Sequence, residues 1–217
     1  MATESTFKNG DAVHVDRPEP VQKKIVSTSN CGLLTVHIQG SLQHVNSKPV
    51  FLTVHDMGSN HDEFIKFVDH PSMLDVKERS IFVHVDLPGQ EDHAADLPED
   101  FQFPDMRADQ LEAGSRRNES HCRAIFGLSQ IWTYPKNLRR YVETFLNRTD
   151  LSEVLESQLK TDVMLVAGSL ASHLHTGRPM ANHMNKTKST LVLIDGVGDV
   201  LMEAPEKFAH NLVLYVQ

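Results

Sequence analysis

The chain has 217 residues, of which 40% are hydrophobic and 23% are charged, and its formal net charge at pH 7 is −8. This length and composition allow one sizeable hydrophobic core. The acidic balance argues against binding to nucleic acid or to an anionic membrane, because both need clustered lysine and arginine. The two cysteines are too few for a disulfide framework, and no apolar run is long enough to cross a bilayer. We therefore expect a reduced, cytoplasmic protein with no transmembrane segment.

Residues 1–20 are polar, contain two prolines and lack the apolar stretch of a secretory signal. We expect them to be a disordered N-terminal segment and residues 21–217 to form a single domain. At the start of that domain, Val21–Ser27 and Leu33–Ile38 are predicted to pair as a hairpin. In the second of these strands apolar residues alternate with polar ones, which predicts that His37 lies on an exposed face.

Four short apolar runs rich in Val, Ile, Leu and Phe occur further along the chain: Val50–Val54, Phe82–Val85, Met164–Ala167 and Leu191–Ile194. Runs this short are typical of strands buried on both faces of a parallel sheet. We predict that the four strands are adjacent, mostly parallel and covered by helices on both faces. Helical spacing is present in an apolar stripe from Leu138 to Leu146 and in a segment that begins at Pro205. The alternation predicts an α/β fold, with a mostly parallel sheet flanked by helices.

The stretch between Asp86 and Asp162 departs from this alternation. An open α/β sheet should hold at least one more strand there, yet Asp105–Glu119 is highly polar. The best strand candidate is the short run Arg123–Gly127. We therefore expect either a gap or this substitute strand at the centre of the sheet. We also expect a lower stability than that of a chain with the missing segment restored, because strands beside a gap lose ladder hydrogen bonds.

Two loop motifs indicate which kind of α/β fold the chain adopts. Residues 51–61 read FLTVHDMGSNH, and residues 81–94 read IFVHVDLPGQEDHA. A strand that runs into His-Asp-x-Gly, followed about thirty residues later by a strand that ends in Asp-x-Pro-Gly, is typical of an α/β-hydrolase. In that fold the first of these loops supplies one oxyanion N–H group.

These motifs, together with the segments VDLPGQEDHAADLPEDFQFPDMRADQLEAG and YPKNLRRYVETFLNRTDL, closely resemble the N-myc downstream-regulated (NDRG) family. The family's two loop signatures fall here on His55, Asp56, Gly58, Asn60 and His61, and on Asp86, Pro88, Gly89, Gln90 and Asp92. The resemblance covers roughly residues 25–114 and 120–217. It implies an internal deletion after Gly114 that removes the central elbow region. It also implies an α/β-hydrolase-like fold without hydrolase activity, in cytoplasmic proteins of signal transduction, stress and differentiation that bind partner proteins still to be identified.

The three positions of a Ser-His-Asp triad all depart from the hydrolase pattern. The nearest match to a Gly-x-Ser-x-Gly elbow is Gly127–Ile131, where a β-branched isoleucine replaces the second glycine beside Ser129. The acid position after the next-to-last strand is Ala171, and the base position ahead of Pro205 is Gly198. Without an acid or a base, nothing activates a nucleophile. We therefore predict no catalytic residue and a non-enzymatic protein that acts through protein binding. The alternative is a residual serine hydrolase or esterase that uses Ser129.

Thirteen histidines raise the question of a metal site. The tightest pair is His173 and His175, and His55 and His61 form another set with the aspartate that follows each. Neither set has the spacing of a structural zinc site, and no cysteine pair supports one. We therefore expect no metal and no cofactor. His84, inside an apolar strand, is expected to be a buried histidine with a backbone partner.

Overall fold

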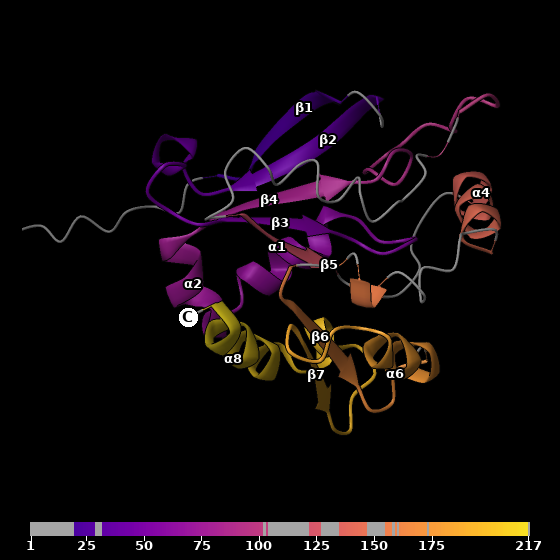
Figure 1. The fold of residues 1–217 in the computed structure, drawn as a ribbon. Coiled ribbons are helices and arrows are strands. Elements are labelled where there is room, and N and C mark those ends of the chain that lie inside the picture. The colour runs from indigo at the N-terminus through magenta and orange to yellow at the C-terminus, as the bar shows by residue number, and fades with distance from the viewer. Residues whose placement is uncertain are drawn as a thin grey trace, which may run out of the picture.

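The computed structural model describes residues 20–28, 32–101, 103, 122–126, 135–146, 155–157, 159, 161–172 and 174–216. Strands and helices alternate along these ranges (Figure 1). In chain order they are β1 (Gln22–Thr28), β2 (Gly32–Gln39), η1 (Leu42–His44), β3 (Val50–Val54), α1 (His61–Val68), η2 (Pro71–Met73), α2 (Leu74–Arg79), β4 (Ile81–Asp86), β5 (Cys122–Phe126), α4 (Pro135–Leu146), β6 (Val163–Gly168), α6 (Leu174–Asn182), β7 (Ser189–Ile194), α7 (Val200–Glu203) and α8 (Pro205–Val216). Within these ranges, no helix is both long and apolar enough to cross a membrane.

The strands of the described residues form two sheets. One has the order β1-β2-β4-β3-β5, and the other pairs β6 with β7. β1 and β2 are the predicted antiparallel hairpin, and β2 also runs antiparallel to β4. β3 is parallel to β4 on one side and to β5 on the other, and β6 is parallel to β7. The predicted α/β fold with a mostly parallel set of strands is therefore confirmed.

β5 is the substitute strand that the sequence pattern indicated, shifted by one residue. It pairs with β3 in parallel, with Val50 opposite Cys122 and Val54 opposite Phe126. Pairing on both sides leaves β3 with no open backbone edge, which suits a strand in the middle of a sheet. Among the described residues, no hydrogen-bonded ladder joins β5 to β6. In the described part of the chain, the fold therefore has a substitute strand beside β3 and a break between β5 and β6.

The prediction that the four apolar runs lie next to one another in a single sheet is wrong. β3 and β4 are neighbours in the larger sheet, whereas β6 and β7 pair with each other in the described part of the chain. Burial on both faces also fails for β7, where Thr190 and Leu193 are exposed. In the described residues β7 has one strand neighbour, β6, so its other edge is not covered by a strand.

β2 is more deeply buried than its alternating pattern predicts. The second half of the strand, Val36–Gln39, is buried throughout, and His37 is only 9% exposed. The ring of His61, at the start of α1, stacks on the ring of His37 and covers it. The prediction that His37 lies on an exposed face is therefore wrong.

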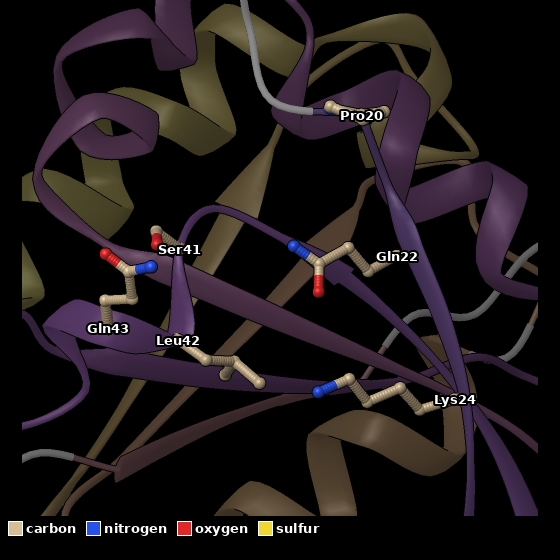
Figure 2. A pocket seen from close by; sticks show the side chains of 6 residues that line it. All are labelled: Pro20, Gln22, Lys24, Ser41, Leu42 and Gln43. Atoms are coloured by element: carbon tan, nitrogen blue, oxygen red, sulfur yellow. The ribbon is translucent and has the colours of Figure 1, made fainter.

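Two open pockets lie on the surface, away from the loops after β3 and β4. One has a volume of 240 Å³ beside β1 and η1 (Figure 2), and its lining residues are Pro20, Gln22, Lys24, Ser41, Leu42 and Gln43. The other has a volume of 410 Å³ between β7 and α8, and it is lined by Val192, Leu193, Ile194, Asp195, Glu206, Lys207, His210 and Asn211. Neither pocket includes a residue of the two loop motifs.

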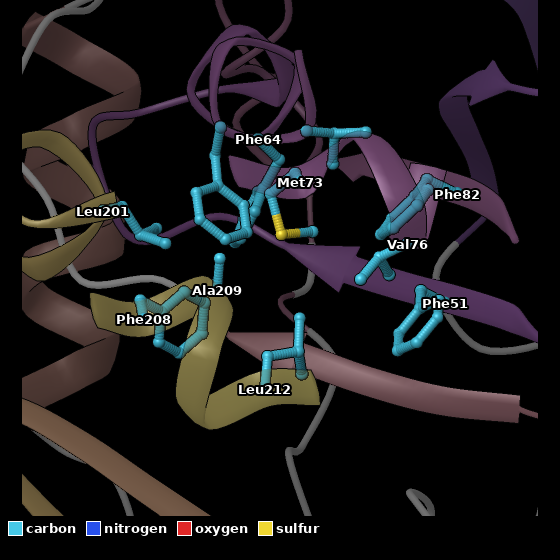
Figure 3. Packing of buried hydrophobic residues seen from close by; sticks show 11 residues of the cluster. Phe51, Phe64, Met73, Val76, Phe82, Leu201, Phe208, Ala209 and Leu212 are labelled. Carbon is cyan, nitrogen blue, oxygen red and sulfur yellow. The ribbon is translucent and has the colours of Figure 1, made fainter. Parts of the chain in front are cut away.

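The hydrophobic core connects the two sheets through the C-terminal helices. Its buried members come from β3, β4, the helices between them, α7 and α8 (Figure 3): Phe51, Phe64, Phe67, Val68, Met73, Val76, Phe82, Leu201, Phe208, Ala209 and Leu212. Phe208 of α8 contacts Phe67 of α1, with ring centroids 5.1 Å apart. Met164 and Val166 of β6 pack against the same cluster. The predicted helix at Pro205 therefore packs between the β6–β7 unit and the larger sheet.

A close approach of two loops holds the ends of β6 and β7 together. A Cβ atom at Gly168, the last residue of β6, would overlap the carbonyl oxygen of Val197 and lie 2.7 Å from that of Gly198. We expect Gly168→Ala to lower the free energy of unfolding by about 1–3 kcal/mol through overpacking. Gly177→Ala, inside α6 with no atom within 4 Å of the new Cβ, should be neutral or stabilising. Urea unfolding compares the two variants, and equal stabilities would contradict the close approach.

Candidate functional site

The loops after β3 and β4 lie at the same end of the sheet, because parallel strands place their carboxyl ends together. His55 and Asp56 follow β3, and Asp86 is the last residue of β4. Gly58, with a φ of 85°, lets the first loop turn sharply, and its N–H group donates to the side-chain oxygen of Gln90 in the second loop. The two loop motifs therefore form one connected site.

Asp86 is the centre of this site. Its side chain is fully buried, and one carboxylate oxygen accepts a hydrogen bond of 2.8 Å from the backbone N–H of His61. The Nδ1 atom of His61 is hydrogen-bonded to this oxygen at 3.0 Å and lies 2.9 Å from the other oxygen. His37 brings its Nε2 atom to 3.2 Å from that same oxygen, and its ring stacks on the His61 ring with centroids 3.3 Å apart. β2, α1 and β4 therefore converge on one buried carboxylate.

The charge of this cluster follows from burial and from the contacts of Asp86. Burial alone would lower the pKa of His61, but the hydrogen bond and the charge of Asp86 outweigh it and raise that pKa. Burial alone would raise the pKa of Asp86, and the contacts with His61 lower it instead. Burial, together with the neighbouring charge of His61, lowers the pKa of His37. The cluster is therefore an ion pair of His61 and Asp86 beside a neutral His37.

Two further histidines are neutral because burial lowers the pKa of each, and both have hydrogen-bond partners at their two ring nitrogens. His55 donates from Nδ1 to the backbone carbonyl of the next residue at 2.7 Å and accepts at Nε2 from the N–H of Leu87 at 3.0 Å. His84 lies between the hydroxyl of Thr53 and the side-chain carbonyl of Gln39, at 2.7 and 2.8 Å. Burial lowers the pKa of His84 to about 3. His84 is buried, as predicted, but its partners are side chains and not the backbone.

The histidine sets considered from the sequence are not brought together as metal sites. Both ring nitrogens of His55 form hydrogen bonds with backbone groups. The Nδ1 atom of His61 is hydrogen-bonded to Asp86 and not to His55. The Nδ1 atom of His175 lies 2.9 Å from a backbone carbonyl oxygen of the preceding turn. His173, the other member of that pair, lies outside the described residues.

The two positions that the sequence pattern predicts for the acid and the base, Ala171 and Gly198, hold no ionisable side chain. Ala171 follows β6 and Gly198 follows β7. Backbone hydrogen bonds join the two loops, such as the one of 2.9 Å from the N–H of Leu170 to the carbonyl of Val197. Ser129, three residues beyond the end of β5, lies outside the described residues. The absence of a catalytic triad therefore stays a prediction.

Helix α4 fixes the loop after β4 in place. Asn137 is 1% exposed, accepts from the N–H of Leu97 at 2.8 Å, and donates to the carbonyls of Gly89 and Ala95 at 2.9 and 3.0 Å. The guanidinium of Arg140 donates to four carbonyl groups of the same loop. Sequence reasoning missed both residues, because it described α4 by its apolar stripe and a polar residue beside that stripe gives no signal of its partners.

Replacement of Asn137 by alanine is expected to lower the free energy of unfolding by about 2 kcal/mol, because buried backbone groups of the loop lose their partners. Arg139→Ala on the same helix is the matched control. Arg139 forms an exposed pair with Glu143 one turn away, so its loss should change the stability by about 0.5 kcal/mol or less. Denaturant unfolding measures both, and an Asn137→Ala variant as stable as Arg139→Ala would show that α4 does not hold the loop.

A model of the Ndr family matches residues 24–115 and 118–217, which is well over half of the chain. The chain belongs to the Ndr family. The resemblance seen in the loop motifs is thus confirmed. The interruption between the two matched segments coincides with the internal deletion expected after Gly114.

Two relatives show how this Ndr-family chain differs in extent. ZK1073.1, an uncharacterized protein of Caenorhabditis elegans, is 34% identical over 272 residues, which cover 89% of this chain and 84% of the relative. That aligned span exceeds the 217 residues of the present chain, so part of the relative has no counterpart here. NDRG4-A of Xenopus laevis is 37% identical over 83 residues, which cover 38% of this chain and 20% of that protein.

Solved structures of hydrolases share the fold of this Ndr-family chain. A membrane phospholipase A, described as a bacterial virulence factor, matches with a TM-score of 0.62 at 14% identity, covering 90% of this chain and 86% of that one. A protein from Thermoplasma acidophilum, described as a predicted CIB-like hydrolase, matches with a TM-score of 0.57 at 12% identity, covering 91% of this chain and 98% of that one. At such low identity the likeness shows the α/β-hydrolase-like fold and nothing about activity.

Proposed function

We propose that this chain is a non-enzymatic Ndr-family protein that acts in the cytoplasm through protein binding, in signal transduction or in a stress or differentiation response. The observation that carries the proposal is the pair of vacant positions at Ala171 and Gly198, where the acid and the base of a hydrolase would stand. A serine without a general base remains a weak nucleophile. The net charge of −8 favours a protein partner over nucleic acid.

The rigidity of the loop after β4 supports a binding role. Gln90 of this loop accepts the N–H of Gly58, and Asn137 and Arg140 of α4 hold the loop backbone from the other side. A loop that is already ordered loses little conformational entropy when a partner binds. This end of the sheet can therefore present a fixed surface to another protein.

A residual serine hydrolase or esterase that uses Ser129 is the second candidate. One observation favours it: β5 pairs with β3, and Ser129 follows β5 by three residues, which is the chain position of a nucleophile elbow. A base is still required. His55 and His84 are neutral, but each already has both ring nitrogens in hydrogen bonds. The second candidate is therefore weaker than the first.

Ester hydrolysis by the purified chain separates the two candidates. The chain and its Ser129→Ala variant are each incubated with p-nitrophenyl acetate, an activated ester. Our proposal expects equal rates for both proteins, since exposed histidines contribute the same background to each. A rate that Ser129→Ala abolishes would establish the hydrolase and contradict the proposal.

Affinity capture tests the binding role itself. The immobilised chain is compared with its Ser129→Ala variant and with a form that lacks residues 105–119, which flank Gly114. We expect a stoichiometric protein partner that Ser129→Ala leaves unchanged. Capture of no partner in stoichiometric amount by the full chain would contradict a binding function.

A further inference from the structure

The cluster around Asp86 contains two buried polar atoms that have no hydrogen-bond partner among the residues that the structure describes. They are Nε2 of His37 and Oδ2 of Asp86. The two atoms are 3.2 Å apart, yet their directions do not satisfy a hydrogen bond. His37 is 9% exposed and Asp86 is fully buried, so neither atom has ready access to bulk water. Buried polar atoms in native proteins nearly always have a partner, and two such atoms facing one another require an explanation.

We propose that His37, His61 and Asp86 form a binding site for one divalent transition-metal ion of the zinc type. Each of the three residues offers one ligand atom, and these atoms lie within 4.8 Å of one another. The ligand atoms would be Nε2 of His37, Nδ1 of His61 and Oδ2 of Asp86. Oδ2 is 3.2 Å from the first and 2.9 Å from the second. Since Nδ1 of His61 is also hydrogen-bonded to Oδ1 of Asp86 at 3.0 Å, the ion would replace the proton of that hydrogen bond, and binding would release it to solvent. Ligands at about 2.0–2.2 Å from a tetrahedral zinc ion lie roughly 3.3–3.5 Å apart, close to this spacing.

The chemistry of the three ligands selects the class of ion. Two imidazole nitrogens and one carboxylate oxygen suit zinc and its first-row neighbours, whereas magnesium and calcium prefer sites made only of oxygen. The three ligands come from β2, α1 and β4, so one ion would link two strands and a helix. A three-residue set leaves a fourth position for water.

The surroundings of His61 supply a second layer of contacts for such an ion. The Nε2 atom of His61, on the far side of the ring from Asp86, lies 3.7 Å from Asp62 and 4.0 Å from Asp92. Asn60 donates to the carboxylate of Asp92 at 2.7 Å and so helps to fix its position. Carboxylates in this place orient a metal-bound imidazole, and they also attract a cation from solvent because both are exposed.

The stacked rings show what must move when the ion binds. The planes of His37 and His61 are within 8° of parallel, so an ion in the plane of one ring lies outside the plane of the other. Rotation of His37 about its Cβ–Cγ bond brings Nε2 toward the ion and ends the stack. The energy profile of that torsion is broad and shallow in proteins, so the torsion itself opposes the rotation only weakly.

Zinc binding to the full chain, expressed without an affinity tag and stripped with a chelator, tests the site. We expect equilibrium dialysis to leave one Zn²⁺ per chain, and we expect the melting temperature to rise by about 5–10 °C at a zinc concentration near 100 times Kd. His37→Phe keeps an aromatic ring on His61 but removes a ligand, and it should weaken binding by about 100-fold or more. His183→Gln, an exposed histidine outside the cluster, is the control and should bind as the parent does. No bound zinc, or equal affinity in His37→Phe and the parent, would overturn the proposal.

Nitrogen-15 spectra of the histidine rings in the parent chain give a readout that does not depend on how well a variant folds. Zinc should shift Nε2 of His37 and Nδ1 of His61, and it should leave both ring nitrogens of His84 unchanged. Shifts confined to exposed histidines such as His175 and His183 would place the ion elsewhere and overturn the assignment.

Discussion

Phe208→Ala is expected to lower the free energy of unfolding by about 3–5 kcal/mol, the largest effect of any single substitution considered for this chain. Phe208 is 8% exposed and lies in the core between α8 and α1, where its ring contacts that of Phe67. Removal of the ring leaves a cavity at the place where the C-terminal helices fasten the β6–β7 unit to the larger sheet. A domain of ordinary stability, about 5–15 kcal/mol, would lose a large share of it.

Leu214→Ala on the same helix is the matched control for that substitution. Leu214 is 59% exposed, so its truncation should change the stability by about 0.5 kcal/mol or less. Urea unfolding followed by circular dichroism measures both variants. If Phe208→Ala were no less stable than Leu214→Ala, α8 would not carry the connection between the two sheets.

Acidification from pH 7 to pH 4 is expected to cost the folded chain about 3 kcal/mol through His84 alone. The pKa of His84 falls from its ordinary value of 6.5 to about 3 in the fold, chiefly because of burial. Below pH 6.5, His84 is therefore protonated in the unfolded chain, whereas in the folded chain it stays neutral until about pH 3. The contribution is fully present above pH 6.5 and is lost as the pH falls toward 3.

His84→Gln isolates this effect from that of the other titrating groups. The variant keeps a polar side chain between Thr53 and Gln39 but removes the titration. Urea unfolding at several pH values, with a chelator present, should show a shallower loss of stability on acidification in the variant than in the parent. Identical pH slopes for the two proteins would contradict the burial of a neutral His84.

Much of the fold could be predicted because its signals are local in the sequence. The hairpin is found where apolar and polar residues alternate, and the four strands are found at the four short apolar runs. The helix that begins at Pro205 is found where proline is typical of a first helical turn. For the centre of the sheet, the sequence left two outcomes open, a gap or a substitute strand, and it did not indicate where a break would lie. A polar stretch shows that a strand is missing, but it does not show which neighbours then pair.

The candidate site was harder to predict because it depends on contacts between distant segments. The loop motifs drew attention to His61 and Asp86, but they did not predict the contact between the two side chains. His37 was assigned to an exposed face, because nothing near it in the chain shows that β2 pairs with β4 or that α1 begins above it. Asn137 and Arg140 were missed for the same reason. The lower stability expected relative to a chain with the missing segment restored stays a prediction.

Covalent labelling with a fluorophosphonate tests the central claim, that a hydrolase scaffold here lacks hydrolase machinery, most directly. Such a reagent reacts with a serine only when a base activates it. Intact-mass analysis of the chain, beside its Ser129→Ala variant and an active serine esterase as positive control, measures the adduct. Our account predicts labelling of the esterase and no adduct on either form of this chain. A single adduct on the parent that Ser129→Ala abolishes would contradict it.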